Sequence, residues 1–266
     1  MRLLSLAPLS LAPLDPVAFI RAARGAGFDH VGLRTLAGSP DACPPDMPCL
    51  IADAASARRA RAALDGEGVR VRELEFVSLD ARSCVADCEP GIARGAMLGT
   101  GYLVAASRDD DPGRRAATFA GLVELAARYG MEVVIEFVPW CAVDDLASAV
   151  ELAQASGAKV LIDVLHLHRS GAGPDDVARL DPALFPYVQL SDAPARYRPE
   201  MAEIIRLATE ERMDPGTGEL EVTALLAALP PGLPISLEVP QLRRLAALGP
   251  VEHARRLRLA TEALLG

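Results

Sequence analysis

The sequence predicts an α/β protein with a single closed (β/α)8 TIM barrel, and three observations support this fold class. Short apolar runs alternate eight times with helix-like segments along the chain. The runs are apolar throughout rather than at every second position, which is typical of parallel strands covered by helices on both faces. The 266 residues divided over eight units give about 33 residues per unit, which suits a barrel of about 250 residues.

Each predicted strand is a short run of apolar and β-branched residues between turn-forming residues. The predicted strands cover residues 2–7, 30–36, 69–79, 102–107, 131–139, 159–166, 187–192 and 234–240. The first strand lies in the stretch MRLLSLAPLSLAPL, whose basic start and apolar body resemble a signal peptide. Two prolines interrupt that stretch, so it fits better as the first strand of the repeat.

Each predicted helix has apolar residues at helical spacing, and several begin with a capping residue, a proline or acidic residues. The predicted helices cover residues 15–28, 52–66, 88–98, 112–129, 143–156, 174–184, 221–229 and 250–265. No linker and no shift in composition divides the chain, so we expect one domain over residues 1–266. The longest connection, residues 193–220, could be a lid over the active face or a solvated loop with a short helix near residues 200–211.

Composition narrows the set of partners. The chain has 27 basic and 36 acidic residues and a net charge of -9, the wrong sign for binding nucleic acid through its phosphates. No apolar run approaches the ~20 residues of a membrane span. We therefore expect a small-molecule ligand, no nucleic acid and no membrane partner, while a homo-oligomer stays open.

The five cysteines form no C-x-x-C pair and show no zinc-finger spacing, which predicts free thiols in a reducing, cytoplasmic compartment. They are Cys43, Cys49, Cys84, Cys88 and Cys141. The only lysine, Lys159, begins a predicted strand and therefore lies far from the active face of a barrel, which disfavours Schiff-base chemistry.

Polar residues interrupt the last four predicted strands near their carboxyl ends. They are Glu136, Asp163, Gln189 and Glu238. Because parallel barrel strands end at one mouth, three carboxylates and one amide should converge there. Each alone could be an ion-paired strand-end residue, but clustered carboxylates repel one another unless a cation intervenes. Oxygen ligands favour Mn²⁺ or Mg²⁺, with Zn²⁺ or Co²⁺ as alternatives.

Gln189 lies in the buried run YVQLSDAP, where an unpartnered amide would cost roughly 1 to 3 kcal/mol. It could be a satisfied core group, a strand-end surface residue or a ligand, and its place between Asp163 and Glu238 favours a carbonyl ligand. Asp192 could begin the next loop or position Gln189. His166, three residues after Asp163, is a candidate acid or base. His168 could line the pocket or belong to the loop.

Several motifs connect the chain with a known superfamily. In order they are GFDHVGLR, IEFVPW, LIDVLHLHRSG, VQLSDAP, PGTGELEV and ISLEVP. Over its full length the chain resembles the xylose isomerase-like superfamily of sugar phosphate isomerases and epimerases, which are TIM barrels. Its members include hydroxypyruvate isomerases, inosose dehydratases, ketose 3-epimerases, 3-dehydroshikimate dehydratases and endonuclease IV. Many members have His at the position of Gln189. In having a glutamine there, this chain resembles the 3-dehydroshikimate dehydratase branch.

The resemblance implies a divalent-metal-dependent isomerase or epimerase that acts on a small hydroxy-carbonyl, sugar-like substrate through an enediolate or enolate. A dehydratase-like lyase and an inactive small-molecule-binding barrel are the alternatives. The net charge of -9 and the four His speak against the endonuclease branch.

The resemblance also implies roles for individual residues. Glu136, Asp163, Gln189 and Glu238 would bind the metal, His166 would assist proton transfer, and Arg212 would face an anionic substrate group. Glu136 and Glu238 are the expected acid/base pair. Arg34 could bind a carboxylate or phosphate, or lie on the surface. Arg34 and the crowded third strand, with Arg72, Glu73 and Glu75, depart from the dehydratase pattern, so we expect a different substrate pocket.

Overall fold

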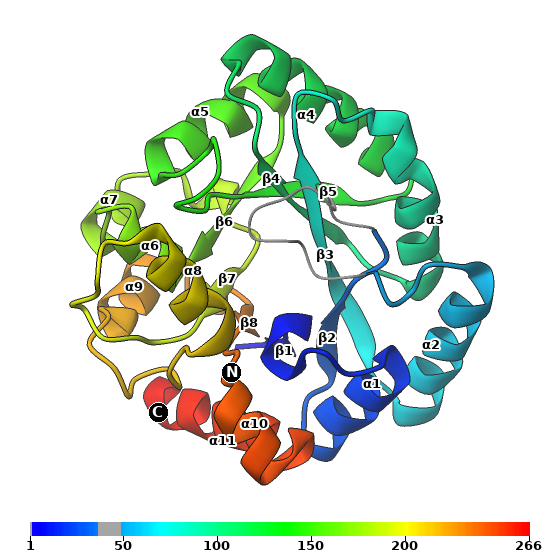
Figure 1. Ribbon diagram of the computed structural model, residues 1–266, viewed down its shortest axis with the longest axis vertical. Helices are drawn as coiled ribbons and strands as arrows, with labels where there is room; N and C mark the ends of the chain where they lie inside the picture. The colour runs from blue at the N-terminus through cyan, green and yellow to red at the C-terminus, as the bar shows by residue number, and fades with distance from the viewer. Residues whose placement is uncertain (1, 37–48) are drawn as a thin grey trace.

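The computed structural model describes residues 2–36 and 49–266, in which eight parallel strands form a closed barrel inside a ring of helices (Figure 1). Each strand pairs with the next, and β1 pairs with β8 to close the barrel. The strands are β1 (Leu4–Leu6), β2 (His30–Leu33), β3 (Arg70–Leu79), β4 (Tyr102–Ser107), β5 (Glu132–Glu136), β6 (Lys159–Asp163), β7 (Val188–Leu190) and β8 (Ile235–Leu237). The predicted TIM barrel is confirmed.

Helices follow the strands and cover the outer face of the barrel (Figure 1). They are α1 (Pro16–Gly25), α2 (Ala54–Glu67), α3 (Glu89–Leu98), α4 (Pro112–Ala127), α5 (Leu146–Ser156), α6 (Val164–Arg169), α7 (Pro174–Ala178), α8 (Met201–Glu210), α9 (Val222–Ala228), α10 (Leu242–Leu248) and α11 (Pro250–Leu265), with short 3-10 turns η1 (Pro8–Leu11), η2 (Val85–Cys88) and η3 (Pro182–Leu184). The helix predicted over residues 174–184 is divided, because Pro182 cannot continue a helix and the Asp181 side chain accepts a hydrogen bond from the amide of Ala183.

The sixth strand is shorter than predicted, and this difference moves a site residue. β6 ends at Asp163, and α6 begins at the next residue. Asp163 caps this helix, since its Oδ1 accepts hydrogen bonds from the amides of Leu165 (2.7 Å) and His166 (3.3 Å). The run 159–166 was predicted as one strand, because a short apolar run does not distinguish strand from helix. His166 therefore lies on a helix.

The apolar core has two parts, one between the barrel and the helices and one inside the barrel. Val104, Val134, Leu161 and Tyr187 fill the barrel interior with fully buried side chains. Above them, polar side chains occupy the carboxyl ends of the strands, and this layered filling positions them at the barrel mouth.

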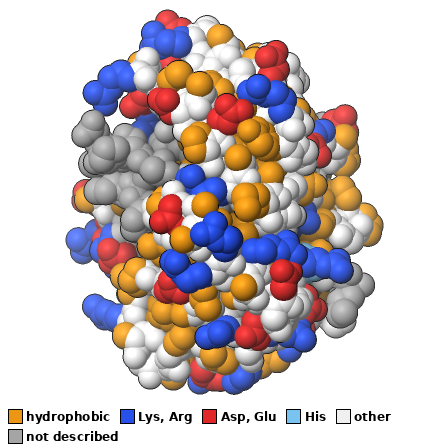
Figure 2. Space-filling model, turned by 90° about the vertical axis from the view of Figure 1, so that its right-hand side faces the viewer, with side chains coloured by type: hydrophobic (Ala, Val, Ile, Leu, Met, Phe, Trp, Pro, Cys, Tyr) orange, Lys and Arg blue, Asp and Glu red, His pale blue; other side chains and the backbone are white. Residues whose placement is uncertain are grey.

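The remaining sequence predictions concern the surface and the cysteines. The four described cysteines are free thiols, and Cys43 lies outside the described residues. Among the described helices, none has the length and apolar character needed to cross a membrane. On the face in Figure 2, basic and acidic side chains are interspersed with hydrophobic ones.

Candidate functional site

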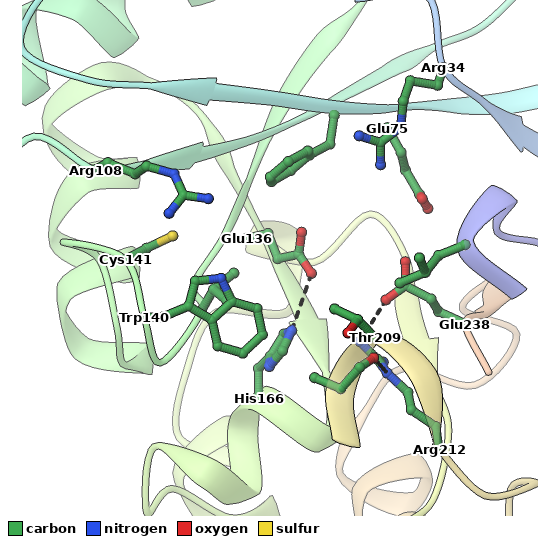
Figure 3. Close-up of a pocket in the computed structure, with 14 residues that line it drawn as sticks. Arg34, Glu75, Arg108, Glu136, Trp140, Cys141, His166, Thr209, Arg212 and Glu238 are labelled. Carbon is green, nitrogen blue, oxygen red and sulfur yellow. Dashed lines mark hydrogen bonds and ion pairs between the residues drawn. The ribbon is translucent and has the colours of Figure 1, made fainter. Parts of the chain in front are cut away.

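A cavity of about 110 Å³ opens at the carboxyl ends of the strands (Figure 3). Its lining combines carboxylates, arginines and aromatic rings. These residues come from η1, β3, β5, α6 and α8 and from the segments that follow β2, β4, β5, β8 and α8. They are Leu9, Arg34, Glu75, Phe76, Arg108, Glu136, Val138, Trp140, Cys141, His166, Ala208, Thr209, Arg212 and Glu238. This is the end of a TIM barrel at which active sites lie.

Three buried side chains form a group that could hold a metal ion. Glu136, Asp163 and His166 each offer one ligand atom, and these atoms lie within 4.8 Å of one another. Nε2 of His166 is 3.6 Å from Oε1 of Glu136. Trp140 packs edge-on against the His166 ring, with ring centroids 5.4 Å apart, and so helps to fix its orientation.

Gln189 is held through its nitrogen, which leaves its oxygen available. Its Nε2 donates a hydrogen bond to Oε1 of Glu75 at 2.9 Å. Its Oε1 is buried and has no hydrogen-bond partner among residues 2–36 and 49–266. Gln189 also pairs with Asp163 in the β6–β7 ladder. A buried amide oxygen without a partner is a neutral ligand that a hard divalent cation accepts, so Gln189 suits the metal that the sequence predicts. Neither Gln189 nor Asp163 is among the residues that line the cavity.

Arg212 enters the same cluster from the segment after α8. Its Nη1 is 2.6 Å from Oδ2 of Asp163, and its Nη2 is 2.8 Å from Oε2 of Glu238. Its Nε donates to the carbonyl of Ala208 at 2.7 Å. The guanidinium is thus a buried counter-cation for two of the predicted metal ligands. It lines the cavity as well, and its contact with a substrate anion stays a prediction.

Burial dominates the electrostatics of the carboxylates. It raises the pKa of Glu136 well above its ordinary value, and repulsion from Glu238 and Asp163 acts in the same direction. Burial likewise raises the pKa of Glu238, although the charge of Arg212 opposes this. Burial also disfavours the charge of Asp163, but Arg212 and the other favourable contacts hold the pKa of Asp163 below its ordinary value. The cluster therefore contains one firmly ionised carboxylate beside carboxyl groups that retain protons more readily.

His166 is neutral at physiological pH. Burial lowers its pKa to about 4, and this outweighs the attraction of Asp163. Its Nδ1 is buried without a hydrogen-bond partner in the part of the chain that the structure describes. A neutral imidazole beside Glu136 can accept or pass on a proton, which is consistent with the predicted role in proton transfer.

The other predicted substrate residues differ in position. Arg34 lines the cavity and lies 5.4 Å from the centroid of the Phe76 ring. His168 is not among the residues that line this cavity. Its Nδ1 is 2.9 Å from Nη1 of Arg169, and its ring centroid is 6.5 Å from that of Tyr197. The structure therefore places Arg34, but not His168, at the barrel mouth.

Asp192 begins a loop rather than positioning Gln189. Its Oδ1 accepts hydrogen bonds from the amides of Ala193 (2.8 Å) and Leu220 (3.0 Å), and its Oδ2 accepts one from Gly216 (3.0 Å). These bonds tie together the two ends of the connection over residues 193–220. Asp192 thereby supports the segment that carries Arg212.

Two polar residues of the site were not predicted as functional. Glu75 lies on β3 and anchors Gln189. Arg108 directly follows β4, lines the cavity, and donates through Nε to Oγ of Ser78 at 2.8 Å. The signal that identified Glu136 and Glu238, a polar residue at the carboxyl end of a strand, would also have identified Arg108 had it been applied to the early strands.

A closed parallel barrel with buried carboxylates at the carboxyl ends of its strands has the architecture of TIM-barrel enzymes. Residues 20–263 match the sequence profile described as "Xylose isomerase-like TIM barrel". The chain belongs to this family. No curated protein matches it by sequence.

Solved structures share the fold at low sequence identity. The IOLI protein, described with a binding zinc atom, is 16% identical with a TM-score of 0.79, and the match covers 99% of this chain and 98% of that one. The probable 3-DHS dehydratase AsbF from Bacillus anthracis is 14% identical with a TM-score of 0.69, covering 98% and 99%. A xylose isomerase-like TIM barrel/4-hydroxyphenylpyruvate dioxygenase fusion protein is 20% identical with a TM-score of 0.79, and this chain covers 42% of it. At these identities the likeness shows the fold alone.

Proposed function

We propose that the protein is a divalent-metal-dependent enzyme of the isomerase or epimerase type, which moves a proton on a small hydroxy-carbonyl, sugar-like substrate. The observation that carries the proposal is the buried group of Glu136, Asp163 and His166, together with the unpartnered Oε1 of Gln189 on the strand next to Asp163. Membership of the xylose isomerase-like family and the zinc described for a structural neighbour support it.

The proposed metal ligands are Glu136, Asp163, Gln189 and Glu238. An all-oxygen set favours Mn²⁺ or Mg²⁺, while Zn²⁺ or Co²⁺ are alternatives because His166 lies close enough to add a nitrogen. When bound, such a cation would polarise the substrate carbonyl and stabilise the negative charge that develops as the adjacent C–H proton leaves.

The protein's own groups carry the proton. Glu136 ends β5 and Glu238 follows β8, so the two carboxylates approach the cavity from different parts of the barrel wall. One carboxylate removes the proton and the other returns it, and the neutral imidazole of His166 can relay it from Glu136.

A proton-exchange experiment tests this proposal. The metal-free protein is loaded with Mn²⁺, Mg²⁺, Zn²⁺ or Co²⁺ and incubated in D2O with ketoses such as D-fructose. We expect metal-dependent incorporation of deuterium next to the carbonyl, detected by NMR, together with new isomers. Failure to bind any of these metals and to exchange a proton on any substrate would instead favour an inactive binding barrel.

A second candidate, a 3-dehydroshikimate dehydratase-like lyase, is favoured by the basic side chains of the cavity. Arg34, Arg108 and Arg212 all line it, and guanidinium groups bind carboxylates well. 3-Dehydroshikimate carries a carboxylate, whereas D-fructose is neutral. A structural neighbour is described as a probable 3-DHS dehydratase. Incubation with 3-dehydroshikimate would give an aromatic product that absorbs ultraviolet light, and the absence of this signal beside active ketose exchange would exclude the lyase.

A further inference from the structure

Arg212 occupies oxygens that the proposed metal also needs. Its Nη1 and Nη2 lie 2.6 Å from Oδ2 of Asp163 and 2.8 Å from Oε2 of Glu238. A divalent cation such as Mg²⁺ binds carboxylate oxygens at about 2.0 to 2.1 Å. Two positive groups in contact with the same two buried oxygens repel each other strongly, because little solvent screens them.

Both oxygens of Asp163 already accept hydrogen bonds. Its Oδ1 accepts the capping hydrogen bonds of α6, at 2.7 Å from the amide of Leu165 and 3.3 Å from that of His166. Its Oδ2 is therefore the oxygen that remains for a cation, and Arg212 holds it. A metal ion at Oδ2 would lie against this guanidinium, and the two positive charges would repel each other.

We propose that Arg212 competes with the divalent metal for Asp163 and Glu238, so that metal binding requires its guanidinium to withdraw from these carboxylates. This inference rests on the metal site of the proposed function. Arg212 then acts as an internal cation that keeps the carboxylates neutralised in the metal-free protein. It also sets the metal affinity below the value that the oxygen ligands alone would give.

The surroundings confine this withdrawal to the side chain. The amide of Arg212 donates to the carbonyl of Pro240 at 2.9 Å, and its carbonyl accepts from Nε2 of Gln241 at 3.2 Å. The neighbouring residue Met213 pairs with Asp192 in an antiparallel bridge. The backbone is thus fixed, whereas the side chain borders the cavity (Figure 3). Rotation toward the cavity would release the two carboxylates and present the guanidinium to a bound anion.

Metal titration of purified variants tests the competition. Arg212→Met removes the charge and keeps an apolar side chain of comparable length, whereas Arg212→Lys keeps the charge. Calorimetric titration with Mn²⁺ and with Zn²⁺ should show metal binding at least about ten-fold tighter for Arg212→Met, with Arg212→Lys between it and the wild type. Arg206→Gln is the matched control, since Arg206 on α8 also pairs with two carboxylates, Glu203 and Glu211, outside the cavity. Its metal affinity should equal that of the wild type.

Stability in the absence of metal gives a second readout. In excess chelator, Arg212→Met should melt roughly 5 to 15 °C below the wild type, because its buried carboxylates lose their counter-cation. Added metal should recover more of the melting temperature in this variant than in the wild type. Equal or weaker metal binding by folded Arg212→Met would overturn the competition.

A measurement on the wild type covers the case in which Arg212→Met does not fold. The Nε–H of Arg212 is buried and hydrogen-bonded to Ala208, so its nitrogen-15 NMR signal reports on the position of the guanidinium. Once calorimetry shows that the wild type has bound Zn²⁺, this signal should shift and its hydrogen exchange should be faster. An unchanged signal in the metal-bound protein would contradict the proposal. If the wild type binds no metal but Arg212→Met does, the competition holds and the metal-dependent function fails. If both bind equally, the competition fails and the function stands.

Discussion

At the scale of single residues, Glu238 offers the most direct test of the chemistry. Its side chain is 7% exposed and lies 2.8 Å from Arg212. Replacement by Gln keeps the shape but removes the basic carboxylate, so we expect a folded variant whose turnover falls by about 10²- to 10⁴-fold. Steady-state kinetics and circular dichroism measure both properties. Glu262→Gln, on α11, is the control and should keep full activity, while a fully active Glu238→Gln would remove Glu238 from the mechanism.

Gln189 tests the metal site without reference to turnover. Gln189→Leu removes the carbonyl oxygen, and we expect metal affinity to fall at least about ten-fold in a calorimetric titration. Gln189→His supplies a ring nitrogen in the same slot and should retain metal binding. The comparison separates the loss of a ligand from general damage to the core. Undiminished binding by the Leu variant would show that the glutamine is only a buried polar residue.

The position of a residue could be predicted from sequence where a strand imposed the geometry, whereas its role stays a prediction. Glu136, Asp163 and Glu238 were expected together because strand ends meet at the barrel mouth. The structure places Glu136 and Asp163 in one group with His166, while Glu238 meets Asp163 through Arg212. The contact of Arg212 with Asp163 and Glu238 could not be predicted, because Arg212 lies in a long connection that follows no regular strand or helix pattern. In such a segment, the sequence does not indicate in which direction a side chain points.

At the scale of elements, the connection over residues 193–220 depends on a close approach at Gly218. A Cβ at this position would lie 2.3 Å from Oδ1 of Asp192 and 2.7 Å from the carbonyl oxygen of Ala193. Gly218→Ala should therefore lower the free energy of unfolding by about 1 to 3 kcal/mol, measured by urea denaturation. Gly66→Ala, in α2 with open space around its Cβ, should be neutral or stabilising by up to about 1 kcal/mol. Equal stability of both variants would contradict the steric argument.

Element boundaries show where sequence patterns lose information. The alternation of apolar runs and capped helices identified all eight strands, because each packs against helices on its outer face. The end of β6 was placed too late, since residues 164 and 165 are apolar in either structure. The hydrogen bonds by which Asp163 caps α6 decide between strand and helix for these residues. They depend on the position of the Asp163 side chain, which also belongs to the candidate site.

At the scale of the whole molecule, Glu73 inside the barrel couples stability to pH. Burial raises the pKa of Glu73 to about 7 from 4.5, although hydrogen bonds donated by Ser236 and Ser5 oppose the rise. The folded protein thus holds this proton to higher pH than the unfolded chain. The contribution of the protonated Glu73 to the free energy of unfolding is fully present below about pH 4.5. It is lost as the pH rises to about 7, which lowers the free energy of unfolding by roughly 3 kcal/mol.

The variant Glu73→Gln isolates this contribution, because the amide is neutral at every pH. Relative to the wild type, its free energy of unfolding should rise by roughly 3 kcal/mol between about pH 4.5 and pH 7. Urea denaturation at a series of pH values measures the difference. Parallel stability curves for the two proteins would show that Glu73 does not retain its proton on folding.

The hydrogen bonds by which Asp163 caps α6 also affect which metal ions the proposed site would hold. Because Oδ1 caps the helix, binding of a cation through both oxygens of Asp163 would compete with these hydrogen bonds, so binding through Oδ2 alone is favoured. Ca²⁺ gathers six to eight oxygens and often takes both oxygens of a carboxylate, whereas Mg²⁺ and Mn²⁺ accept fewer protein ligands. If the proposed site binds a metal through one oxygen of Asp163, we expect it to prefer Mg²⁺ or Mn²⁺ over Ca²⁺, which competitive calorimetric titration would measure.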